Sequence, residues 1–427
     1  MRIILIINKL YSMKTNPFLS AQKQMTTAYE FLKGKYDDEF PRLLSPDRVI
    51  EVSIPVKMDS GEVKVFTGFR SQHNSSRGPY KGGVRYHQDV TREEVMALSM
   101  WMSIKCSTLD LPLGGGKGGI IVDPKTLSKR ELEALSRGWV DQLYKYIGPL
   151  DDVPAPDVNT NGEIMSWFVD EYSKLVGHWS PGAITGKPIS IGGSLGRDTA
   201  TAQGGLYVLE AYLNGKNDFL KGKKVVIQGA GNAGLNMIEL IAKSGAILIA
   251  TSDSHGGIYN ENGLNVDEII RLKKDKKSLG EYTGGGTISN SELLELPCDI
   301  LIPAALENQI TLENAGNIHA KLILELANGP ITPDADEVLY KNGIPVIPDI
   351  LANAGGVTVS YFEQVQNSMN YYWSKEEVQE KLKLKMEKAL YGVVKSAQTH
   401  GVMLRTGAYV VALERILEAM RARYAIK

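Results

Sequence analysis

The feature that most constrains the fold of this chain is a glycine pattern placed between a short apolar strand and a helix. Residues 223–228 (KKVVIQ) predict a strand, and residues 229–234 (GAGNAG) hold the pattern G-x-G-x-x-G. A helical segment and a second strand follow, and that strand ends at Asp253, 19 positions after Gly234. A strand, a glycine turn, a helix and an acidic residue at this distance form the fingerprint of a dinucleotide-binding fold. The sequence therefore predicts a Rossmann-type sheet here.

Each glycine of the pattern has a physical role in such a fold. Gly229 allows the tight turn, Gly231 lets the backbone approach a pyrophosphate, and Gly234 lets the helix pack on the strand. The pyrophosphate is expected at the start of the helix, where free N–H groups and the helix dipole favour negative charge. We expect these three glycines to bind the cofactor.

The choice between NAD and NADP depends on the surroundings of Asp253. Its carboxylate could accept hydrogen bonds from the adenosine ribose of NAD and would repel the 2′-phosphate of NADP. Ser252, Ser254 and His255 flank it, however, and their hydroxyl and imidazole groups could satisfy that phosphate. We expect NAD, with use of both cofactors as the alternative.

Apolar patterns on either side of the glycine turn predict further strands and helices. Strands are expected as a hairpin within 49–69 and as buried runs at 298–303, 321–326 and 344–348. Helices are expected at 91–109, 131–147, 199–214, 375–399 and 403–424. The first helix would start with a capping box formed by Thr91 and Glu94, and the second with one formed by Ser128 and Glu131.

Two segments in the first half of the chain combine lysines with many glycines. They are residues 78–87 (GPYKGGVRYH) and 105–120 (KCSTLDLPLGGGKGGI), and the second does not fit a P-loop. Glycine lets a backbone approach a ligand closely, and a lysine held there meets little solvent, which lowers its pKa. We expect Lys81 and Lys105 to anchor carboxylates and Lys117 to suit acid–base chemistry.

Asp157 follows two prolines in residues 153–160 (VPAPDVNT), just ahead of a predicted helix. Its carboxylate could simply cap that helix. Alternatively, it could move a proton to or from a substrate amine beside a lysine base. The sequence leaves both interpretations open.

Charge balance and the scarcity of cysteine and histidine exclude several classes of protein. The 427 residues include 48 basic and 49 acidic side chains, so no nucleic-acid partner is expected. Two cysteines and six scattered histidines predict no metal site. The apolar run at residues 3–7 is too short for a signal peptide or a membrane span. We interpret it as an N-terminal extension, with Met13 as an alternative start, and expect a cytoplasmic protein without membrane contact.

Seven motifs in a fixed order resemble the glutamate, leucine, phenylalanine and valine dehydrogenases, and the glutamate dehydrogenases among them in particular. The resemblance extends from about residue 20 to the end of the chain. The matching segments are 78–87, 103–120, 152–157 (DVPAPD), 185–201 (TGKPISIGGSLGRDTAT), 227–234 (IQGAGNAG), 325–330 (ELANGP) and 351–363 (LANAGGVTVSYFE).

The resemblance implies a two-domain α/β fold with the active site in the cleft between the domains. A substrate-binding and oligomerisation domain is expected at 13–190, to which 405–427 returns, and a Rossmann-type dinucleotide-binding domain at 191–404. The resemblance also implies a homohexamer.

Specific roles follow from the resemblance. Lys81, helped by Ser360, would hold the side-chain carboxylate of the substrate, and Lys105 would bind its α-carboxylate. Lys117 would be the catalytic lysine and Asp157 the catalytic aspartate.

Four further residues would lie close to the cofactor. Thr201, Asn232 and Asn328 would contact it, and Asn353 would bind substrate where the substrate meets the nicotinamide.

The resemblance implies reversible NAD(P)-dependent oxidative deamination of L-glutamate to 2-oxoglutarate and ammonium. Family members that act on branched-chain or aromatic amino acids have an apolar residue in place of Lys81, so Lys81 and Ser360 favour a dicarboxylate. A dehydrogenase for an apolar amino acid is the alternative enzyme, and a sensor of dinucleotide or glutamate is the alternative class. Pro156 stands where a glycine is common in the family, which puts the loop geometry at Asp157 in question.

Overall fold

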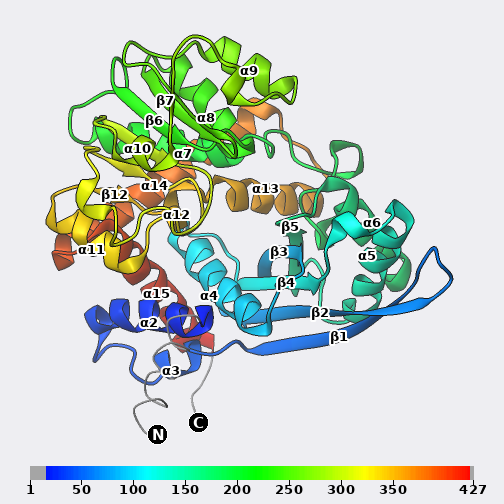
Figure 1. The fold of residues 1–427 in the computed structure, drawn as a ribbon. Coiled ribbons are helices and arrows are strands. Elements are labelled where there is room, and N and C mark those ends of the chain that lie inside the picture. The colour runs from blue at the N-terminus through cyan, green and yellow to red at the C-terminus, as the bar shows by residue number, and fades with distance from the viewer. Residues whose placement is uncertain (1–15, 424–427) are drawn as a thin grey trace, which may run out of the picture. The chain divides into compact units, whose positions relative to one another are not determined.

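The computed structural model describes residues 16–423, which divide into two compact units (Figure 1). The first unit is formed by Met1–Leu195, Val357–Val378 and Tyr409–Lys427, and the second by Gly196–Gly356 and Gln379–Ala408. The chain therefore passes from one unit to the other four times. The apolar run at residues 3–7 and the alternative start at Met13 lie outside the described residues.

This division differs from the expected boundaries in one internal segment and at two ends, because 191–195 belong to the first unit and 405–408 to the second. Residues 357–378 were expected in the second domain, whereas they pack with the first unit. The reason is hydrogen bonding, because Glu363 bonds to Lys187 and Gln366 bonds to Ser194.

The first unit is built on a five-stranded mixed sheet with the order β1-β2-β4-β3-β5. Its strands are β1 (Arg48–Lys57), β2 (Val63–Asn74), β3 (Tyr80–His87), β4 (Gly115–Ile121) and β5 (Asp152–Pro156). β1 and β2 form the predicted antiparallel hairpin, and β3 pairs in parallel with both β4 and β5. Helices wholly within this unit are α2 (Pro17–Tyr29), α3 (Phe40–Leu43), α4 (Arg92–Thr108), α5 (Lys129–Leu143) and α6 (Gly162–Val176).

The two faces of this sheet carry different side chains. Val84 and Ile120 pack with Trp139 of α5 in a buried apolar cluster. Because side chains alternate along a strand, Lys81 and Lys117 extend from the opposite face. The strands therefore place both lysines on the face turned away from α5.

The second unit is built on a seven-stranded sheet with the order β12-β11-β10-β6-β7-β8-β9. Its strands are β6 (Lys224–Gln228), β7 (Ile247–Asp253), β8 (Gly256–Tyr259), β9 (Gly286–Ile288), β10 (Ile300–Pro303), β11 (Ile323–Leu324) and β12 (Val346–Ile347). Neighbouring strands from β12 to β7 are parallel, and β8 and β9 extend one edge in antiparallel pairing. The Rossmann-type α/β arrangement is confirmed.

The remaining helices belong to the second unit or run between the units. Those of the second unit are α7 (Ala200–Asn214), α8 (Asn232–Lys243), α9 (Val266–Lys274), α10 (Asn290–Glu295), α11 (Pro333–Lys341) and α12 (Asp349–Ala352). α13 (Gly355–Met369), α14 (Lys375–His400) and α15 (Leu404–Arg423) each begin in one unit and end in the other.

The two predicted capping boxes differ in the structure. At the start of α5, Ser128 and Glu131 form both reciprocal hydrogen bonds. At the start of α4, Thr91 accepts a hydrogen bond from the backbone N–H of Glu94, but the Glu94 carboxylate is bonded to Arg85. The capping box at Thr91 is therefore only half formed.

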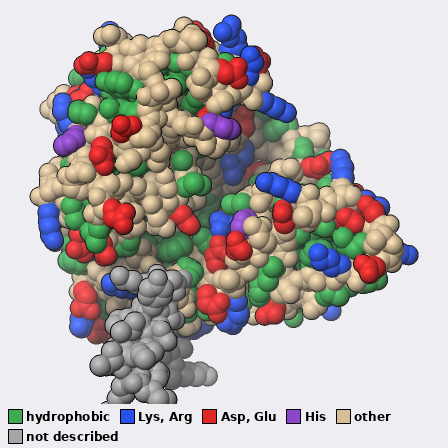
Figure 2. All heavy atoms as spheres, viewed as in Figure 1, with side chains coloured by type: hydrophobic (Ala, Val, Ile, Leu, Met, Phe, Trp, Pro, Cys, Tyr) green, Lys and Arg blue, Asp and Glu red, His purple; other side chains and the backbone are tan. Residues whose placement is uncertain are grey.

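The surface carries both signs of charge. On the face shown in Figure 2, Lys and Arg side chains are intermixed with Asp and Glu side chains. Among residues 16–423, no helix combines the length and the apolar character that a membrane crossing requires.

Candidate active site

Glycines of the lysine–glycine segments let strands of the first sheet come very close together. A Cβ on Gly82 of β3 would lie 1.6 Å from the carbonyl oxygen of Gly116 on β4. A Cβ on Gly83 would lie 2.7 Å from the Cβ of Asp157, which follows β5. A side chain fits at neither position, so contacts within the protein already require both glycines.

Lys117 and Asp157 form a direct ion pair at these strands. Lys117 Nζ lies 2.7 Å from Asp157 Oδ1, and the exposed fractions of the two side chains are 7% and 19%. Burial lowers the pKa of Lys117 and the charge of Arg85 lowers it further, against the opposing charge of Asp157. The structure thus brings the two predicted catalytic residues together, and the low exposure expected for Lys117 is confirmed.

Asp157 does not cap the helix that follows it, so that interpretation of the sequence is wrong. The cap of α6 is Asn161, whose side chain accepts a hydrogen bond from the backbone N–H of Ile164. Both Asp157 oxygens bind cations instead, Oδ1 to Lys117 at 2.7 Å and Oδ2 to Arg85 at 2.9 Å. Burial alone would raise the pKa of Asp157, but the charges of Lys117 and Arg85 hold it well below its usual range.

Pro156 is accommodated without disturbing Asp157. It is the last residue of β5 and pairs with Val84 of β3. The backbone N–H of Asp157 then donates to Thr160 Oγ1 at 2.7 Å, which fixes the start of the loop.

Lys81 and Lys105 lie near the same buried thiol. Lys81 is 1% exposed, and its Nζ donates to the carbonyl oxygen of Val153 at 3.1 Å. Lys105 is a partly buried residue of α4. Burial raises the pKa of Cys106 to about 12, and the charges of Lys81 and Lys105 both act against this rise. Both predicted carboxylate anchors therefore affect the same thiol, which is the residue next to Lys105 in α4.

Ser360 belongs to α13, next to a buried ion pair. Ser360 is 2% exposed, and one helical turn later Glu363 binds Lys187 at 2.7 Å with both side chains fully buried. Glu363 also accepts a hydrogen bond from the backbone N–H of Gly186 at 2.8 Å. The pair ties the segment around Lys187 to the helix that carries Ser360.

The glycine turn between β6 and α8 has the geometry that a bound pyrophosphate requires. Gly229 has a φ of +95°, and a Cβ on Gly234 would lie 1.8 Å from the carbonyl oxygen of Gly229. Gly231 is the N-cap residue of α8, and a Cβ placed on it would have no atom within 4 Å, so the space in front of the helix is open. The first N–H groups of α8, beginning with the exposed Asn232, are therefore suited to a phosphate. The described residues fit a dinucleotide.

Asp253 at the end of β7 is held by its own unit. Its Oδ2 accepts hydrogen bonds from Lys273 Nζ at 2.8 Å and from the backbone N–H of Leu279 at 3.0 Å. Ser252, considered from the sequence as a partner for a 2′-phosphate, is buried and accepts a hydrogen bond from the backbone N–H of Gly229 at 3.1 Å. Ser252 is therefore not suited to that role.

The predicted asparagines are in direct contact. Asn353 Nδ2 donates to Asn328 Oδ1 at 2.9 Å and to the carbonyl oxygen of Ala327 at 3.1 Å. Thr201 lies in the first turn of α7, where its Oγ1 would be 3.0 Å from a Cβ on Gly356.

One arginine next to these asparagine loops binds three carboxylates. Arg405 contacts Glu325, Asp336 and Asp349 at 2.8, 2.6 and 3.2 Å, and we call these four residues the carboxylate-rich cluster. Asp349 also accepts a hydrogen bond from the backbone N–H of Gly329 at 2.9 Å. The cluster thereby holds the loop that carries Asn328.

Family models match both parts of the chain. Residues 192–423 match the model described as Glutamate/Leucine/Phenylalanine/Valine dehydrogenase. Residues 46–174 match the model described as Glu/Leu/Phe/Val dehydrogenase, dimerisation domain. The chain belongs to this dehydrogenase family.

Similar family members are known from several bacteria. The chain is 50% identical over 408 residues to the catabolic NAD-specific glutamate dehydrogenase RocG of Bacillus subtilis, with 96% of each chain covered. It is 50% identical over 395 residues to the NAD-specific glutamate dehydrogenase of Staphylococcus aureus, with 92% of this chain and 94% of the relative covered.

Solved structures of family members have the same fold. The glutamate dehydrogenase from Peptoniphilus asaccharolyticus is similar with a TM-score of 0.86 and 47% identity, covering 96% of this chain and 99% of that one. The hetero-hexameric glutamate dehydrogenase from Thermus thermophilus, in a leucine-bound form, is similar with a TM-score of 0.89 and 36% identity, covering 95% and 96%.

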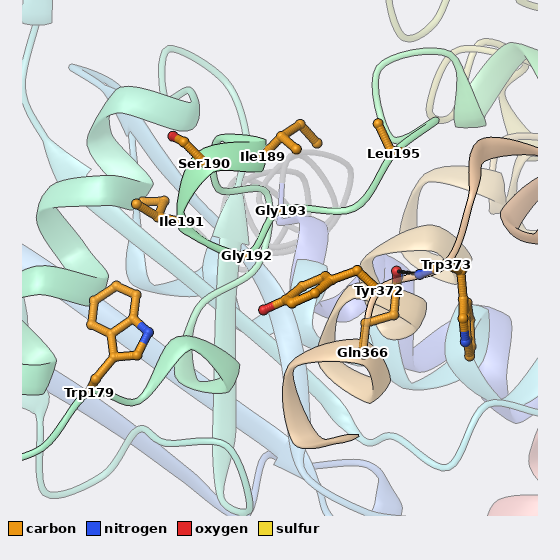
Figure 3. Close-up of a pocket in the computed structure, with 10 residues that line it drawn as sticks. All are labelled: Trp179, Ile189, Ser190, Ile191, Gly192, Gly193, Leu195, Gln366, Tyr372 and Trp373. Atoms are coloured by element: carbon orange, nitrogen blue, oxygen red, sulfur yellow. Dashed lines mark hydrogen bonds between the residues drawn. The ribbon is translucent and has the colours of Figure 1, made fainter. Parts of the chain in front are cut away.

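The first unit of this dehydrogenase also contains an apolar pocket of about 570 Å³ (Figure 3). Gln366 accepts a hydrogen bond from the backbone N–H of Trp373 at its edge. The pocket is lined by Trp179, Ile189, Ser190, Ile191, Gly192, Gly193, Leu195, Gln366, Tyr372 and Trp373. No lysine, arginine or carboxylate is among these residues, so the pocket is unsuited to a dicarboxylate.

Sequence reasoning did not single out several residues that the structure places at or near the site. Arg85 binds Asp157, and Lys187 lies next to the helix of Ser360. Thr185 is fully buried, and its hydroxyl oxygen has no hydrogen-bond partner among residues 16–423. Arg85, Lys187 and Thr185 all lie inside motifs that carried the family resemblance, so the motifs were the available signal.

Proposed function

We propose that this chain is an NAD-dependent glutamate dehydrogenase that catalyses reversible oxidative deamination of L-glutamate to 2-oxoglutarate and ammonium. The observation that carries the proposal is the 2.7 Å contact of Lys117 with Asp157, where burial lowers the pKa of the lysine. A lysine whose pKa is lowered is better suited to act as a general base than an exposed one. The names of relatives at 50% identity, NAD-specific glutamate dehydrogenase, support the same reaction and cofactor.

The proposed substrate is a dicarboxylic amino acid held at both ends. Lys81 and Ser360 bind the side-chain carboxylate, and Lys105 binds the α-carboxylate. A buried ammonium group requires a compensating charge, and a carboxylate supplies it. The alternative is an apolar amino acid, as for the leucine, phenylalanine and valine enzymes of the family, but its side chain would offer Lys81 no charge.

The proposed chemistry divides between two residues. Asp157 accepts a proton from the substrate amino group and returns one to the departing ammonia. Lys117 takes a proton from the water that attacks the imine carbon, and its contact with Asp157 orients the pair. Holding the two carboxylates fixes Cα, whose position matters because small misplacements slow the reaction. NAD, when bound, would accept the hydride from Cα.

The second unit would supply the cofactor site. The proposed contacts are Gly229, Gly231, Asn232 and Gly234 for the pyrophosphate, Asp253 for the adenosine ribose, and Thr201, Asn328 and Asn353 on the nicotinamide side. Lys273 binds Asp253 Oδ2, and Oδ1 accepts one hydrogen bond, from the backbone N–H of His255 at 2.9 Å, so a ribose hydroxyl would share Oδ1 with that N–H. NADP is the weaker alternative, because the Asp253 carboxylate would repel a 2′-phosphate and Ser252 already binds the backbone N–H of Gly229.

We further propose a cytoplasmic homohexamer with a substrate-binding and assembly domain and a dinucleotide-binding domain. The match of residues 46–174 to a dimerisation domain supports assembly through the first unit. The hetero-hexameric enzyme from Thermus thermophilus supports the subunit number. Light scattering of the purified chain tests it.

The direct test follows nicotinamide absorbance with purified protein, 2-oxoglutarate and ammonium, using NADH and NADPH separately. We expect ammonium-dependent oxidation that is faster with NADH. Lys117→Ala should lower kcat by about 10²- to 10⁴-fold, the usual contribution of a general base. A folded protein with no turnover on either cofactor would contradict the proposal and favour a sensor.

The substrate class is tested separately with Lys81→Met. We expect loss of glutamate oxidation, mainly through KM, because the variant lacks the charge that binds the side-chain carboxylate. Leucine, phenylalanine and valine serve as comparison substrates. Unchanged glutamate activity in the variant would overturn the assignment of Lys81.

A further inference from the structure

We propose that Arg85, anchored by Glu94, is a positioning residue of this reaction, which holds Asp157 in place and sets the charge that Lys117 experiences. The inference rests on the proposed function, because it describes the control of the proposed base. It adds two residues to the site that neither the glycine pattern nor the lysine–glycine segments singled out.

The four residues form a continuous chain of alternating charge, which we call the balanced cluster. Lys117 binds Asp157 Oδ1 at 2.7 Å, Arg85 Nε binds Asp157 Oδ2 at 2.9 Å, and Arg85 Nη1 binds Glu94 Oε1 at 2.5 Å. The exposed fractions rise along the chain, from 7% for Lys117 through 19% and 24% to 25% for Glu94. The cluster therefore runs from a nearly buried ammonium to a partly exposed carboxylate.

The members come from four different elements. Lys117 is on β4, Asp157 follows β5, Arg85 is on β3, and Glu94 is in the first turn of α4. The planar guanidinium of Arg85 has several N–H donors in a fixed arrangement, so it can bind both carboxylates at once. A residue that only filled space between strands would not need these two bonds.

Glu94 provides a second, independent observation. Its position three residues after Thr91 is the position from which a glutamate normally returns a hydrogen bond to the helix cap. The carboxylate binds Arg85 instead. At α5, by contrast, Glu131 does complete the box with Ser128. The different use of Glu94 indicates that Arg85 requires a second carboxylate partner besides Asp157.

The charges of the balanced cluster affect the protonation of Lys117. Burial lowers the pKa of Lys117, Arg85 lowers it further, and the charges of Asp157 and Glu94 raise it. Asp157 alone would stabilise the ammonium form and so keep the proton on the proposed base. Arg85 compensates that charge, which permits the 2.7 Å contact while Lys117 can still lose its proton. Because an arginine stays charged throughout the working range, the compensation does not change with pH.

The test is the pH dependence of kcat/KM for glutamate oxidation, which rises as Lys117 loses its proton. Arg85→Gln removes a positive charge, so we expect the midpoint to move up by about one pH unit. Glu94→Gln removes a negative charge, so we expect a smaller move in the opposite direction. Arg85→Lys keeps the charge and should retain the midpoint with a lower kcat.

A matched control separates these shifts from general effects of losing an ion pair. Arg137 has an exposed fraction of 25%, close to the 24% of Arg85, and binds carboxylates on α5 and α6. Arg137→Gln should leave the midpoint unchanged. Equal midpoints for the wild type, Arg85→Gln and Glu94→Gln, or shifts in the same direction, would overturn the inference.

Variants without measurable turnover remain informative through the reactivity of Lys117 itself. The rate at which an amine-directed reagent modifies Lys117, located by peptide mass spectrometry, reports its protonation at each pH and should show the same shifts. If Lys117→Ala is inactive but the Arg85 and Glu94 variants do not shift, only this inference fails. If Lys117→Ala stays fully active, the proposed function of the site fails.

Discussion

The balanced cluster of the first unit and the carboxylate-rich cluster of the second unit are both built around an arginine, but their charges differ. In the first, two cations alternate with two carboxylates, Asp157 and Glu94. In the second, Arg405 alone faces three carboxylates. The second is also the drier, because the exposed fractions of Glu325 and Asp336 are 0% and 4%.

The two clusters also differ in the group that can gain or lose a proton. In the balanced cluster the adjustable group is a lysine whose pKa is lowered by burial and by Arg85. In the carboxylate-rich cluster, burial raises the pKa of Glu325 to about 7; Arg405 opposes the rise, and the charges of Asp349 and Asp336 add to it. A cluster with equal numbers of positive and negative charges suits a proton-transfer site. An excess of buried carboxylates instead makes the free energy of unfolding depend on pH.

The largest expected effect comes from breaking the balanced cluster at its centre. Asp157→Asn removes the carboxylate that joins Lys117 and Arg85, so we expect kcat to fall by up to about 10⁴-fold. Steady-state kinetics at saturating substrate measure it. Asp170→Asn, at a more exposed carboxylate of the same unit, is the control. A loss below about tenfold would mean that the pair is not catalytic.

The next effect comes from removing the cation of the carboxylate-rich cluster. Arg405→Met leaves three carboxylates without their shared partner, and we expect a loss of about 3–5 kcal/mol in the free energy of unfolding. Arg130→Met, which breaks an ion pair whose side chains are 57% and 52% exposed, should cost about 0–1 kcal/mol. Urea unfolding at one fixed chain concentration compares them. Similar losses for both variants would contradict the distinction between the clusters.

The smallest effect is a change in the pH dependence of stability. Because the pKa of Glu325 is raised to about 7 from 4.5, the folded chain binds a proton in this range that the unfolded chain has released. The stability contributed by this group is therefore fully present below about pH 4.5 and is lost as the pH rises through about 7. Glu325→Gln should reduce that loss by about 2–3 kcal/mol between pH 5 and pH 8.

Urea midpoints at several pH values measure this change. Glu133→Gln, a partly exposed surface glutamate, is the matched control and should follow the wild type. If the free energy of unfolding of the Glu325→Gln variant changes with pH as steeply as that of the wild type, the titration belongs to another group.

Local patterns in the sequence predicted much of the fold. The glycine turn before α8, the β1–β2 hairpin and the capping box at Ser128 each depend on residues close together in the chain, and each is present. The buried Lys81 and Lys117 were also expected from their glycine surroundings.

The clusters could not be predicted because their members are distant in sequence. Arg85 and Asp157 are 72 positions apart, and Glu325 and Arg405 are 80 positions apart. No sequence periodicity links residues so far apart in the chain. They meet only because of the order of the strands in each sheet and the return of a C-terminal helix to the unit. The half-formed capping box at Thr91 and the cap that Asp157 does not form have the same origin, since Asp157 and Glu94 both bind Arg85 instead.

The discontinuous second unit limits how family members can exchange parts. A graft of Gly196–Gly356 alone would carry Glu325, Asp336 and Asp349 but not Arg405, which returns with Gln379–Ala408. Such a graft would depend on the host to provide the missing guanidinium at the right place. Swapping nucleotide preference between relatives therefore calls for transferring both stretches together, or for point substitutions around Asp253 that leave the cluster intact.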